Sequence, residues 1–342
     1  MTSQDQSLLW VDRLKVRIPV RGDLRTVIHD ATFAIAPGEA VGLVGESGSG
    51  KSMTARAIMR LLPPRAQTSG SVSFDGQPVL SMGRAALRHL RATQIGMIYQ
   101  DPRAHINPVR SNGDFLLEAM LAQGIKPAAA RSRALDLLAQ VGIADGGRRL
   151  RQYPHQLSGG LLQRIMIAAA LAASPRLLLA DEPTTALDVT TQSEVMAILG
   201  ELRSDRGLAM LFITHDLDLA SAVTDRMAVM YAGMIVEIGS SAGIRDAALH
   251  PYTVGLLGSR PEIGNRARIK VIPGRPVSAF EAGPGCVFTA RCPYATDRCN
   301  AERPSLRPVG AQLVACHRAE ELRGTITFAG PPEPAAEATA GG

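Results

Sequence analysis

Cysteine is almost absent from this sequence. The first 285 of its 342 residues contain none, and the four cysteines then follow at positions 286, 292, 299 and 316. All four cysteines thus stand at one end of a chain that otherwise avoids them, and what they do there depends on what the rest of the chain is.

Long hydrophobic runs are also absent. The longest, IMIAAALAA at 165–173, is far shorter than the ~18–20 apolar residues of a membrane-spanning helix. The first residues, MTSQDQSLLWVDR, lack the basic segment followed by an apolar segment that marks a signal peptide. We therefore expect a chain without a membrane span of its own, in a reducing compartment where disulfides are rare.

Blocks of like charge are missing as well. The 37 basic and 31 acidic residues give a formal net charge of +6, but the excess is mostly arginine scattered along the chain. A surface that binds nucleic acid usually gathers its basic residues in one place. The charge pattern therefore does not favour a nucleic-acid partner.

What the sequence does contain is an alternation of strand and helix patterns. Short apolar runs typical of buried strands occur at 40–45, 176–183 and 208–216. Helical patterns lie between these runs, which predicts a mostly parallel α/β sheet. The first forty residues alternate apolar and polar residues, and 226–239 is typical of a hairpin that turns at Ala232-Gly233. After about residue 250 the periodicity fades, which predicts a domain boundary near 258–262.

The segment GESGSGKS at 45–52 fits the phosphate-binding pattern G-x-x-x-x-G-K-[ST], between a predicted strand and a predicted helix. Glycines let the backbone wrap around phosphates with its N–H groups pointing inward, and the following helix adds the positive end of its dipole. Lys51 can reach the β- and γ-phosphates, and the Ser52 hydroxyl can bind Mg²⁺. The nucleotide-binding residues expected in this loop are Gly45, Glu46, Ser47, Gly48, Ser49, Gly50, Lys51 and Ser52.

Asp181 and Glu182 end a predicted buried strand with the sequence LLLADEP. A carboxylate at that place is costly unless it has a cation or hydrogen-bond donors, and a Mg²⁺ shared with Ser52 would be such a partner for Asp181. Glu182 stands at the carboxyl edge of the strand, where ligands bind in open α/β sheets. It could deprotonate a water for attack on the γ-phosphate, a role worth ~10²–10⁴-fold in rate.

The segment QLSGGLLQR at 156–164 predicts a second anion-binding helix start. Ser158 is a good N-cap, and Gly159 and Gly160 open a long apolar helix. One chain has little reason to direct two such sites at one triphosphate. Two chains facing head to tail would instead give each ATP the phosphate loop of one and the Ser-Gly-Gly of the other.

Together with Gln100, the ALD segment at 186–188 and His215, these motifs form an ordered set. In this set the chain resembles the ATP-binding-cassette (ABC) ATPases over about residues 8–240. The resemblance implies an α/β P-loop nucleotide-binding domain at 1–258 that binds ATP and Mg²⁺. It also implies a mixed sheet core, an antiparallel N-terminal β-subdomain and a helical subdomain at about 101–175.

The resemblance implies a role for each residue of the set. Glu182, Gln100 and His215 are the expected catalytic residues, and Gln100 joins Ser52 and Asp181 as a Mg²⁺ ligand. The residues expected to act across a cassette dimer are Ser158, Gly159 and Gly160, which complete the partner's ATP site, and Asp188, which ties the two subunits together.

Two positions depart from the family pattern. Leu161 stands where many members have Gln, which spares the phosphate-facing serine and glycines. Ile18 stands where an aromatic residue usually stacks on adenine, and its aliphatic surface would forgo about 1 kcal/mol of stacking. We expect ATPase activity to survive with Leu161. We expect the affinity for nucleotide to be the property that Ile18 affects.

The C-terminal region narrows the resemblance to importer subunits for oligopeptides and dipeptides, a group that also includes nickel importers. The segments HPYTVGLLGSRP, GCVFTARCPYATDRC and VACH carry this likeness. It implies a transporter-type C-terminal domain at 259–324, and the Pro/Ala/Gly tail at 325–342 is expected to be disordered. The expected function is ATP hydrolysis that powers peptide import at the cytoplasmic face of the inner membrane. The alternatives are import of nickel, glutathione or another small solute and, from another functional class, a soluble ABC ATPase acting on nucleic acid.

The same resemblance implies the partners. They are a second, related but different ATPase chain, two transmembrane permease subunits and an extracytoplasmic peptide-binding protein. Nucleic acid is not among them.

The cysteines have the spacing C-x5-C-x6-C-x16-C. Structural zinc sites favour closer C-x2–4-C pairs, whereas wider spacing suits an iron–sulfur cluster with corners several ångströms apart. Some members of the resembled family carry a [4Fe–4S] cluster at this motif, so we expect Cys286, Cys292, Cys299 and Cys316 to ligate one. Zinc and free or oxidised thiols are the alternatives.

Overall fold

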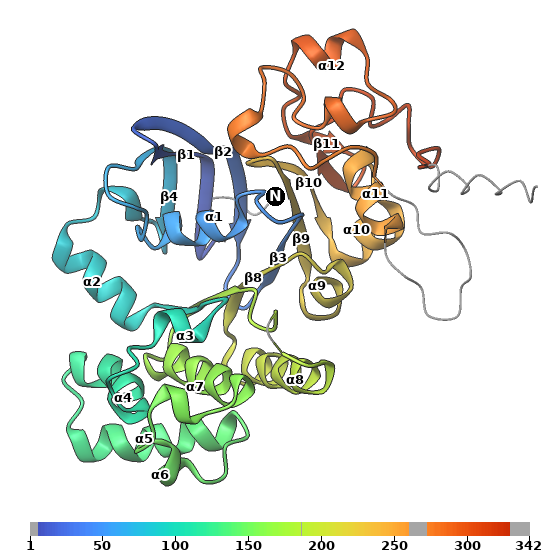
Figure 1. Cartoon of the computed structure of the whole chain (residues 1–342). Coiled ribbons are helices and arrows are strands. Elements are labelled where there is room, and N and C mark those ends of the chain that lie inside the picture. The colour runs from blue at the N-terminus through green and yellow to red at the C-terminus, as the bar shows by residue number, and fades with distance from the viewer. Residues whose placement is uncertain (1–5, 186, 260–271, 329–342) are drawn as a thin grey trace, which may run out of the picture.

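The computed structural model describes residues 6–185, 187–259 and 272–328. Its centre is a mixed sheet with the strand order β5-β4-β1-β2-β10-β9-β3-β8-β7-β6 (Figure 1). The strands are β1 (Leu9–Val20), β2 (Asp23–Ile35), β3 (Ala40–Val44), β4 (Gln67–Phe74), β5 (Gln77–Pro78), β6 (Ile95–Ile98), β7 (Leu177–Asp181), β8 (Ala209–Thr214), β9 (Arg226–Tyr231), β10 (Met234–Ser240), β11 (Arg307–Val309) and β12 (Gln312–Val314).

The core of the sheet is parallel, as the apolar runs predict. Strand β3 pairs with β8 and β9, and β7 pairs with β6 and β8, all in the parallel sense. Both faces of these strands are covered: in β8, Met210 and Phe212 belong to one hydrophobic cluster, and Leu211 and Ile213 belong to the other. Their carboxyl ends therefore meet at one edge of the sheet, where Asp181 lies.

The N-terminal strands form the expected antiparallel layer. Strand β1 pairs antiparallel with both β2 and β4. The hairpin of β9 and β10 is also confirmed, since Ala232 and Gly233 between them have φ angles of 43° and 81°. Two successive positive φ values fit a tight turn whose twist matches that of the paired strands.

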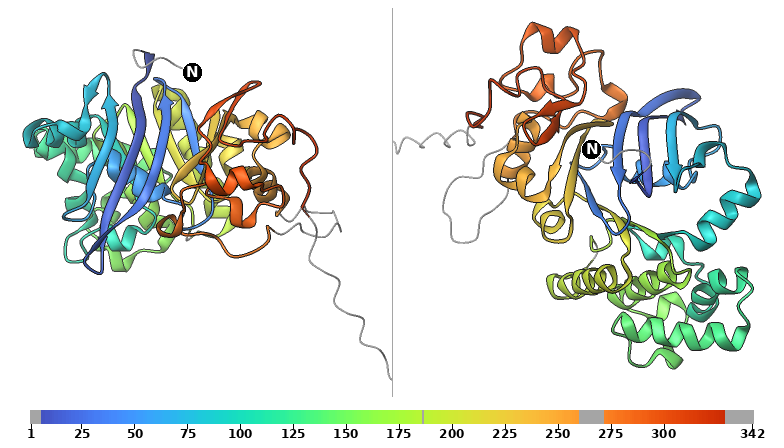
Figure 2. Two further views of the ribbon diagram at one scale, coloured as in Figure 1. Left: turned by 90° about the horizontal axis from the view of Figure 1, so that it is seen from above. Right: turned by 180° about the vertical axis from the view of Figure 1, so that it is seen from behind.

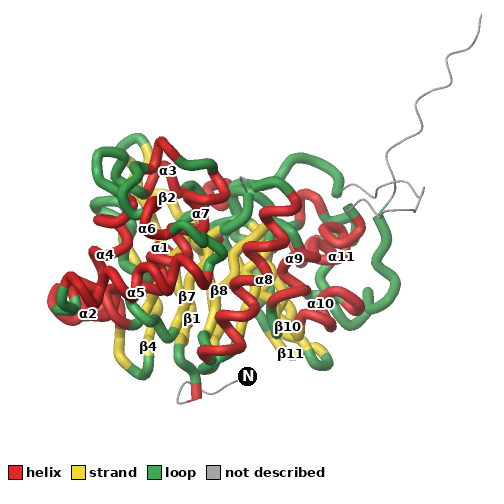
Figure 3. Tube along the Cα trace, turned by 90° about the horizontal axis from the view of Figure 1, so that it is seen from below, coloured by secondary structure: helices red, strands yellow, loops and turns green. Residues whose placement is uncertain are grey.

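Helices cover both faces of the sheet and build a separate lobe. The helices of the nucleotide-binding region are α1 (Lys51–Ile58), α2 (Arg84–Thr93), α3 (Pro102–His105), α4 (Asn112–Ala122), α5 (Pro127–Gln140), α6 (Gly146–Arg149), α7 (Gly159–Ala172), α8 (Val189–Arg206), α9 (Leu217–Val223), α10 (Ser241–Ala247) and α11 (Pro251–Gly258). Helices α3 to α7 form the lower lobe in Figure 1, within the range expected for the helical subdomain. Seen from below, α8 and α9 lie across the strands (Figure 3). None of the helices in the described residues is long and apolar enough to cross a membrane.

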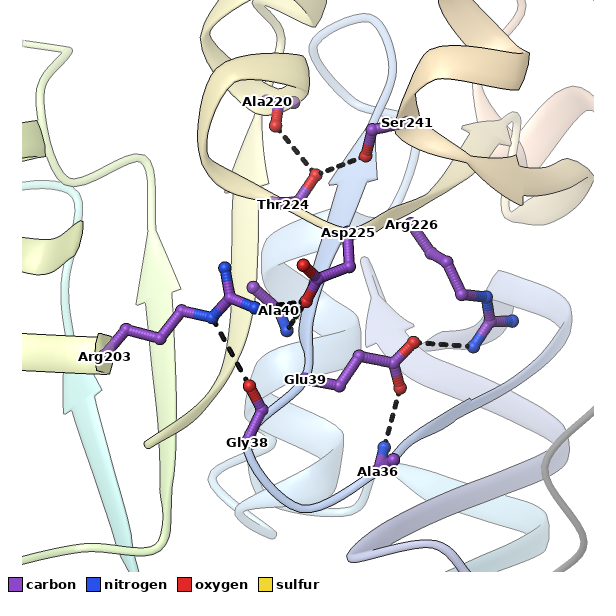
Figure 4. A network of polar contacts seen from close by, with 10 residues as sticks. All are labelled: Ala36, Gly38, Glu39, Ala40, Arg203, Ala220, Thr224, Asp225, Arg226 and Ser241. Carbon is purple, nitrogen blue, oxygen red and sulfur yellow. Dashed lines mark hydrogen bonds and ion pairs between the residues drawn. The ribbon is translucent and has the colours of Figure 1, made fainter. Parts of the chain in front are cut away.

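Two carboxylates fix the amino ends of β3 and β9 (Figure 4). Asp225 accepts the Ala40 N–H and an ion pair from Arg203 of α8. Glu39 forms an ion pair of 3.0 Å with Arg226. Because these residues come from the starts of adjacent strands and from a covering helix, they hold the parallel core in register at the edge opposite the carboxyl ends.

The C-terminal region extends the central sheet. Strand β12 pairs antiparallel with β10, and the Ala315 N–H donates to Val236 O at 2.8 Å. The region also contains the short α12 (Asp297–Ala301), and it packs beside β10 and α11 in both views of Figure 2. Phe328 is buried, so the first residues of the expected tail pack on the fold, and 329–342 lie outside the described residues.

Candidate active site

The phosphate loop connects β3 to α1, as the sequence predicts. Gly45 passes so close to β9 that a Cβ there would lie 2.1 Å from Met230 O, which excludes any side chain. Lys51 Nζ donates to Gly45 O at 2.7 Å and to Glu46 O at 2.9 Å, and burial lowers the pKa of this amine. The Ser49 hydroxyl is buried and has no hydrogen-bond partner within the described part of the chain. A backbone cradle with a buried amine and an unpaired hydroxyl fits the phosphates of a nucleotide.

Ser52 and Asp181 meet at the end of β7. Ser52 Oγ donates to Asp181 Oδ1 at 2.7 Å, across 129 residues of sequence. Asp181 is 2% exposed, and burial raises the pKa of its carboxyl. A hydroxyl and a carboxylate oxygen are donors that Mg²⁺ favours, and a cation would relieve the cost of the buried charge. The pair therefore fits the expected Mg²⁺ site.

Three side chains converge on Glu182. Its Oε2 accepts hydrogen bonds from Gln100 Nε2 at 2.9 Å and from Thr185 Oγ1 at 2.7 Å. Its Oε1 lies 3.5 Å from His215 Nδ1. Of the three residues predicted to be catalytic, Gln100 and His215 thus each contact Glu182, although the three follow different strands, β6, β7 and β8.

The backbone of Glu182 is held in an unfavourable conformation. Its φ is 44°, in the left-handed region that residues with a Cβ rarely adopt. Its N–H donates to Ile213 O at 2.9 Å, so the neighbouring strand fixes this conformation. Local strain of this kind is frequent at catalytic residues, and here it accompanies the contacts of the carboxylate with Gln100, Thr185 and His215.

The Ser-Gly-Gly segment lies in the helical lobe, away from α1 (Figure 1). Ser158 is the N-cap of α7 and accepts the Leu161 N–H at 3.4 Å. Ser158 is exposed, and Gly160 packs against the Thr191 side chain of α8. The helix start therefore faces outward and is available to another molecule, while Leu161 leaves its cap intact.

Asp188 is the N-cap of α8. Its carboxylate accepts the Thr191 N–H at 3.0 Å and the Thr191 hydroxyl at 2.8 Å, and these bonds lower the pKa of Asp188. Thr191 thus contacts both Asp188 and Gly160, which lies in the first turn of α7. Ala186, in the same expected loop, lies outside the described residues. Ile18 lies in β1, half-buried against the sheet.

Sequence reasoning missed several residues that hold the site. Thr185 follows Glu182 by three residues, so its hydrogen bond could have been anticipated from the turn it ends. Tyr252 accepts the Glu46 N–H at 2.9 Å, and Arg291 forms an ion pair of 2.8 Å with the Glu46 carboxylate. These contacts span 206 and 245 residues of sequence, and no local sequence pattern predicts them.

The four cysteines come together in the C-terminal region. All four are free thiols, and they line one small cavity of about 20 Å³ together with His250 and Phe288. Burial raises the pKa of Cys292 to about 12 and that of Cys316 to about 11. Among residues 6–185, 187–259 and 272–328, no group of three or more His, Cys, Asp or Glu side chains is arranged to hold a single metal ion. The cysteine cavity is therefore observed, whereas the expected metal-binding character of the extension is not shown.

Comparison with known proteins connects both parts of the chain to one group. Residues 28–185 match the family model of the ABC transporter, and 236–299 match that of the oligopeptide/dipeptide transporter, C-terminal region. The chain is 41% identical over 318 residues to the oligopeptide transport ATP-binding protein OppD of Salmonella typhimurium, covering 92% of this chain and 95% of the relative. It is 43% identical over 315 residues to the dipeptide transport ATP-binding protein DppD of Escherichia coli, covering 91% and 96%.

Solved structures share the fold of the nucleotide-binding region. CbiO1 of Clostridium perfringens, part of the ABC transporter complex CbiONQ, superposes with a TM-score of 0.60 at 27% identity, covering 70% of this chain and 90% of that one. The ATP-binding cassette MJ0796, solved as a dimer in a post-hydrolysis state with ADP and Pi, gives a TM-score of 0.62 at 26% identity, covering 68% and 98%. The chain therefore belongs to the family of ATP-hydrolysing subunits of oligopeptide and dipeptide ABC transporters.

Proposed function

We propose that this chain hydrolyses ATP to power the import of di- and oligopeptides. The observation that carries the substrate class is the likeness to peptide transport ATP-binding proteins, at 41–43% identity, over both the nucleotide-binding and the C-terminal regions. The chain works at the cytoplasmic face of the membrane. Its partners are a second, related cassette, two permease subunits and an extracytoplasmic peptide-binding protein.

The hydrolytic step follows from the contacts of Glu182. As water attacks the γ-phosphorus, the Glu182 carboxylate accepts its proton, and the bond from that phosphorus to the oxygen of ADP breaks. Gln100 and Thr185 hold the carboxylate in place through hydrogen bonds. Ser52 and Asp181, with Gln100, would hold Mg²⁺, which neutralises charge on the β- and γ-phosphates.

A groove beside Gln100 supports docking of a permease segment. It encloses about 510 Å³ between β6, α4 and α7. Tyr99 and His105 stack along its wall with ring centroids 3.9 Å apart. Gln100 follows Tyr99 directly and contacts Glu182 at 2.9 Å. A segment that enters this groove and shifts Tyr99 would also shift the residue that holds the catalytic carboxylate, which couples transport to hydrolysis.

Uptake by the complete importer in proteoliposomes tests the substrate class. With ATP inside and the binding protein outside, we expect labelled di- and tripeptides to accumulate, whereas vesicles with the Glu182→Gln chain should accumulate none. Parallel vesicles receive Ni²⁺ or glutathione. Uptake of either in place of peptides would overturn the peptide assignment and leave the ATPase assignment standing.

We propose further that Cys286, Cys292, Cys299 and Cys316 hold a [4Fe–4S] cluster. The four thiols line one cavity, and a set of four cysteines is the usual ligand set of such clusters. Two sulfurs lie near polar groups: the Arg318 N–H donates to Cys316 Sγ at 3.4 Å, and Thr296 Oγ1 lies 3.4 Å from Cys299 Sγ. A bound cluster would link α12, which carries Cys299, to the loops that carry the other three cysteines, in a region with little apolar core of its own.

Anaerobic purification with metal analysis tests the cluster. We expect a brown protein that absorbs near 400 nm, with about four irons and four sulfides per chain. The Cys292→Ser variant should lose most of its iron because one ligand is gone, while Ser305→Ala, in the same region, should retain it. Stoichiometric zinc, or a protein free of metal after anaerobic purification, would contradict the proposal.

A further inference from the structure

Arg291 connects the C-terminal region directly to the phosphate loop. It precedes Cys292 in sequence, and its side chain is only 5% exposed. Its Nη1 lies 2.8 Å from Glu46 Oε2, and Glu46 is the second residue of the phosphate loop. When one partner of a pair so withdrawn from water is removed, the remaining charge is left largely desolvated and unpaired, which costs more than the loss of a pair on the open surface.

The guanidinium of Arg291 is itself held from other sides. Its Nε donates to Pro273 O at 2.9 Å, and Nη1 also lies 3.4 Å from Tyr231 Oη. Its Cζ lies over the Tyr231 ring, 5.8 Å from the centroid. These contacts fix the guanidinium independently of the loop. Arg291 therefore fixes the position of the Glu46 carboxylate, rather than the reverse.

A second contact holds the backbone of the same loop residue. The Glu46 N–H donates to Tyr252 Oη at 2.9 Å, and Glu46 O accepts from Lys51 Nζ at 2.9 Å. The carboxylate, the N–H and the carbonyl of Glu46 are thus all engaged. Lys51 is the proposed phosphate-binding amine, and its Nζ donates to Glu46 O. A shift of Glu46 would therefore also shift this amine.

The same residues form the wall of the cysteine cavity. Phe288 lines the cavity and packs against the Tyr231 and Tyr252 rings, with centroids 5.3 and 5.5 Å away. His250 also lines the cavity, and its Nδ1 accepts the Tyr252 N–H at 3.0 Å. A continuous set of packed side chains therefore runs from the cysteines to the phosphate loop.

We propose that Arg291 is a positioning residue for the phosphate loop, through which the C-terminal cysteine region sets the affinity of the chain for Mg·ATP. The coupling acts in both directions, because a state of one site that favours binding at the other must itself be favoured by that binding. The C-terminal region then contributes to nucleotide binding.

The affinity of the full-length chain for Mg·ATP tests the proposal. In a titration with a fluorescent ATP analogue, Arg291→Gln should weaken binding about tenfold, a typical coupling between two sites. Arg291→Lys, which keeps the charge, should recover part of that loss. Arg275→Gln is the matched control because Arg275 is exposed and pairs with the exposed Glu281. The loss should appear in Kd and in KM, with kcat at saturating ATP nearly unchanged, because Glu182 and its contacts are untouched.

Two further measurements separate positioning from a general loss of structure. In a cycle with Glu46→Gln, the double variant should bind no more weakly than Arg291→Gln alone, since both changes break one interaction. Hydrogen exchange at 286–299 should slow when Mg·ATP binds to the wild type and should not respond in Arg291→Gln. The proposal would be overturned if the affinity losses of the two single variants multiplied in the double variant. An unchanged Kd in Arg291→Gln would also overturn it. So would the absence of any exchange response in the wild type.

Discussion

Replacement of Glu182 by Gln is expected to abolish ATP turnover and leave ATP binding intact. The amide keeps the shape of the side chain, but it cannot accept the proton of the attacking water. Loss of a general base typically reduces the rate ~10²–10⁴-fold. Gln100, Thr185 and His215, which hold this carboxylate, would lose their charged partner. The Ser52–Asp181 pair and Lys51, which we propose bind Mg·ATP, remain as they are.

Steady-state hydrolysis and nucleotide titration check this expectation together. We expect kcat to fall by at least about 100-fold while the Kd for Mg·ATP changes little. Glu201→Gln, at an exposed position of α8, is the matched control and should behave as the wild type. Turnover within a few-fold of the wild type would remove Glu182 from the role of general base. Loss of ATP binding would assign it to the binding site instead.

Features with a local cause could be predicted from the sequence. The phosphate loop follows from a glycine pattern between an apolar run and a helix, and the turn at Ala232-Gly233 follows from its residue types. The placement of Asp181 and Glu182 follows from the edge at which parallel strands end. In each case the signal is a local pattern of residue types, read together with the alternation of strand and helix patterns along the chain.

Features that depend on distant segments could not be predicted in this way. Strand β12 has three residues and gains its stability from pairing with β10, so its own sequence carries almost no strand signal. The Arg291–Glu46 pair joins residues 245 apart. Arginine is common on surfaces, and only the folded arrangement buries this one. The cysteine spacing showed that four thiols could meet, and the fold adds that their cavity shares its walls with the support of the phosphate loop.

Replacement of Ser158 by Arg is expected to damage the ATP site of the partner cassette and spare the site of this chain. Ser158 is exposed at the start of α7, in a lobe apart from α1 (Figure 1). In the proposed dimer, an arginine would place a bulky side chain where the second cassette would present its γ-phosphate, and the loss of the N-cap would cost about 1 kcal/mol of helix stability. Ser111→Arg removes the N-cap of α4 in the same lobe and controls for that local cost.

The most direct test of the composite ATP site compares two quantities in the Ser158→Arg chain. The first is the Kd of the isolated chain for Mg·ATP, and the second is its ATP-dependent association with the partner cassette by light scattering, in a Glu182→Gln background. We predict a Kd within about twofold of that without the arginine, and at least about a hundredfold weaker association, ~2.7 kcal/mol. A weakened Kd in the isolated chain, or unchanged association, would contradict an ATP site shared between two cassettes.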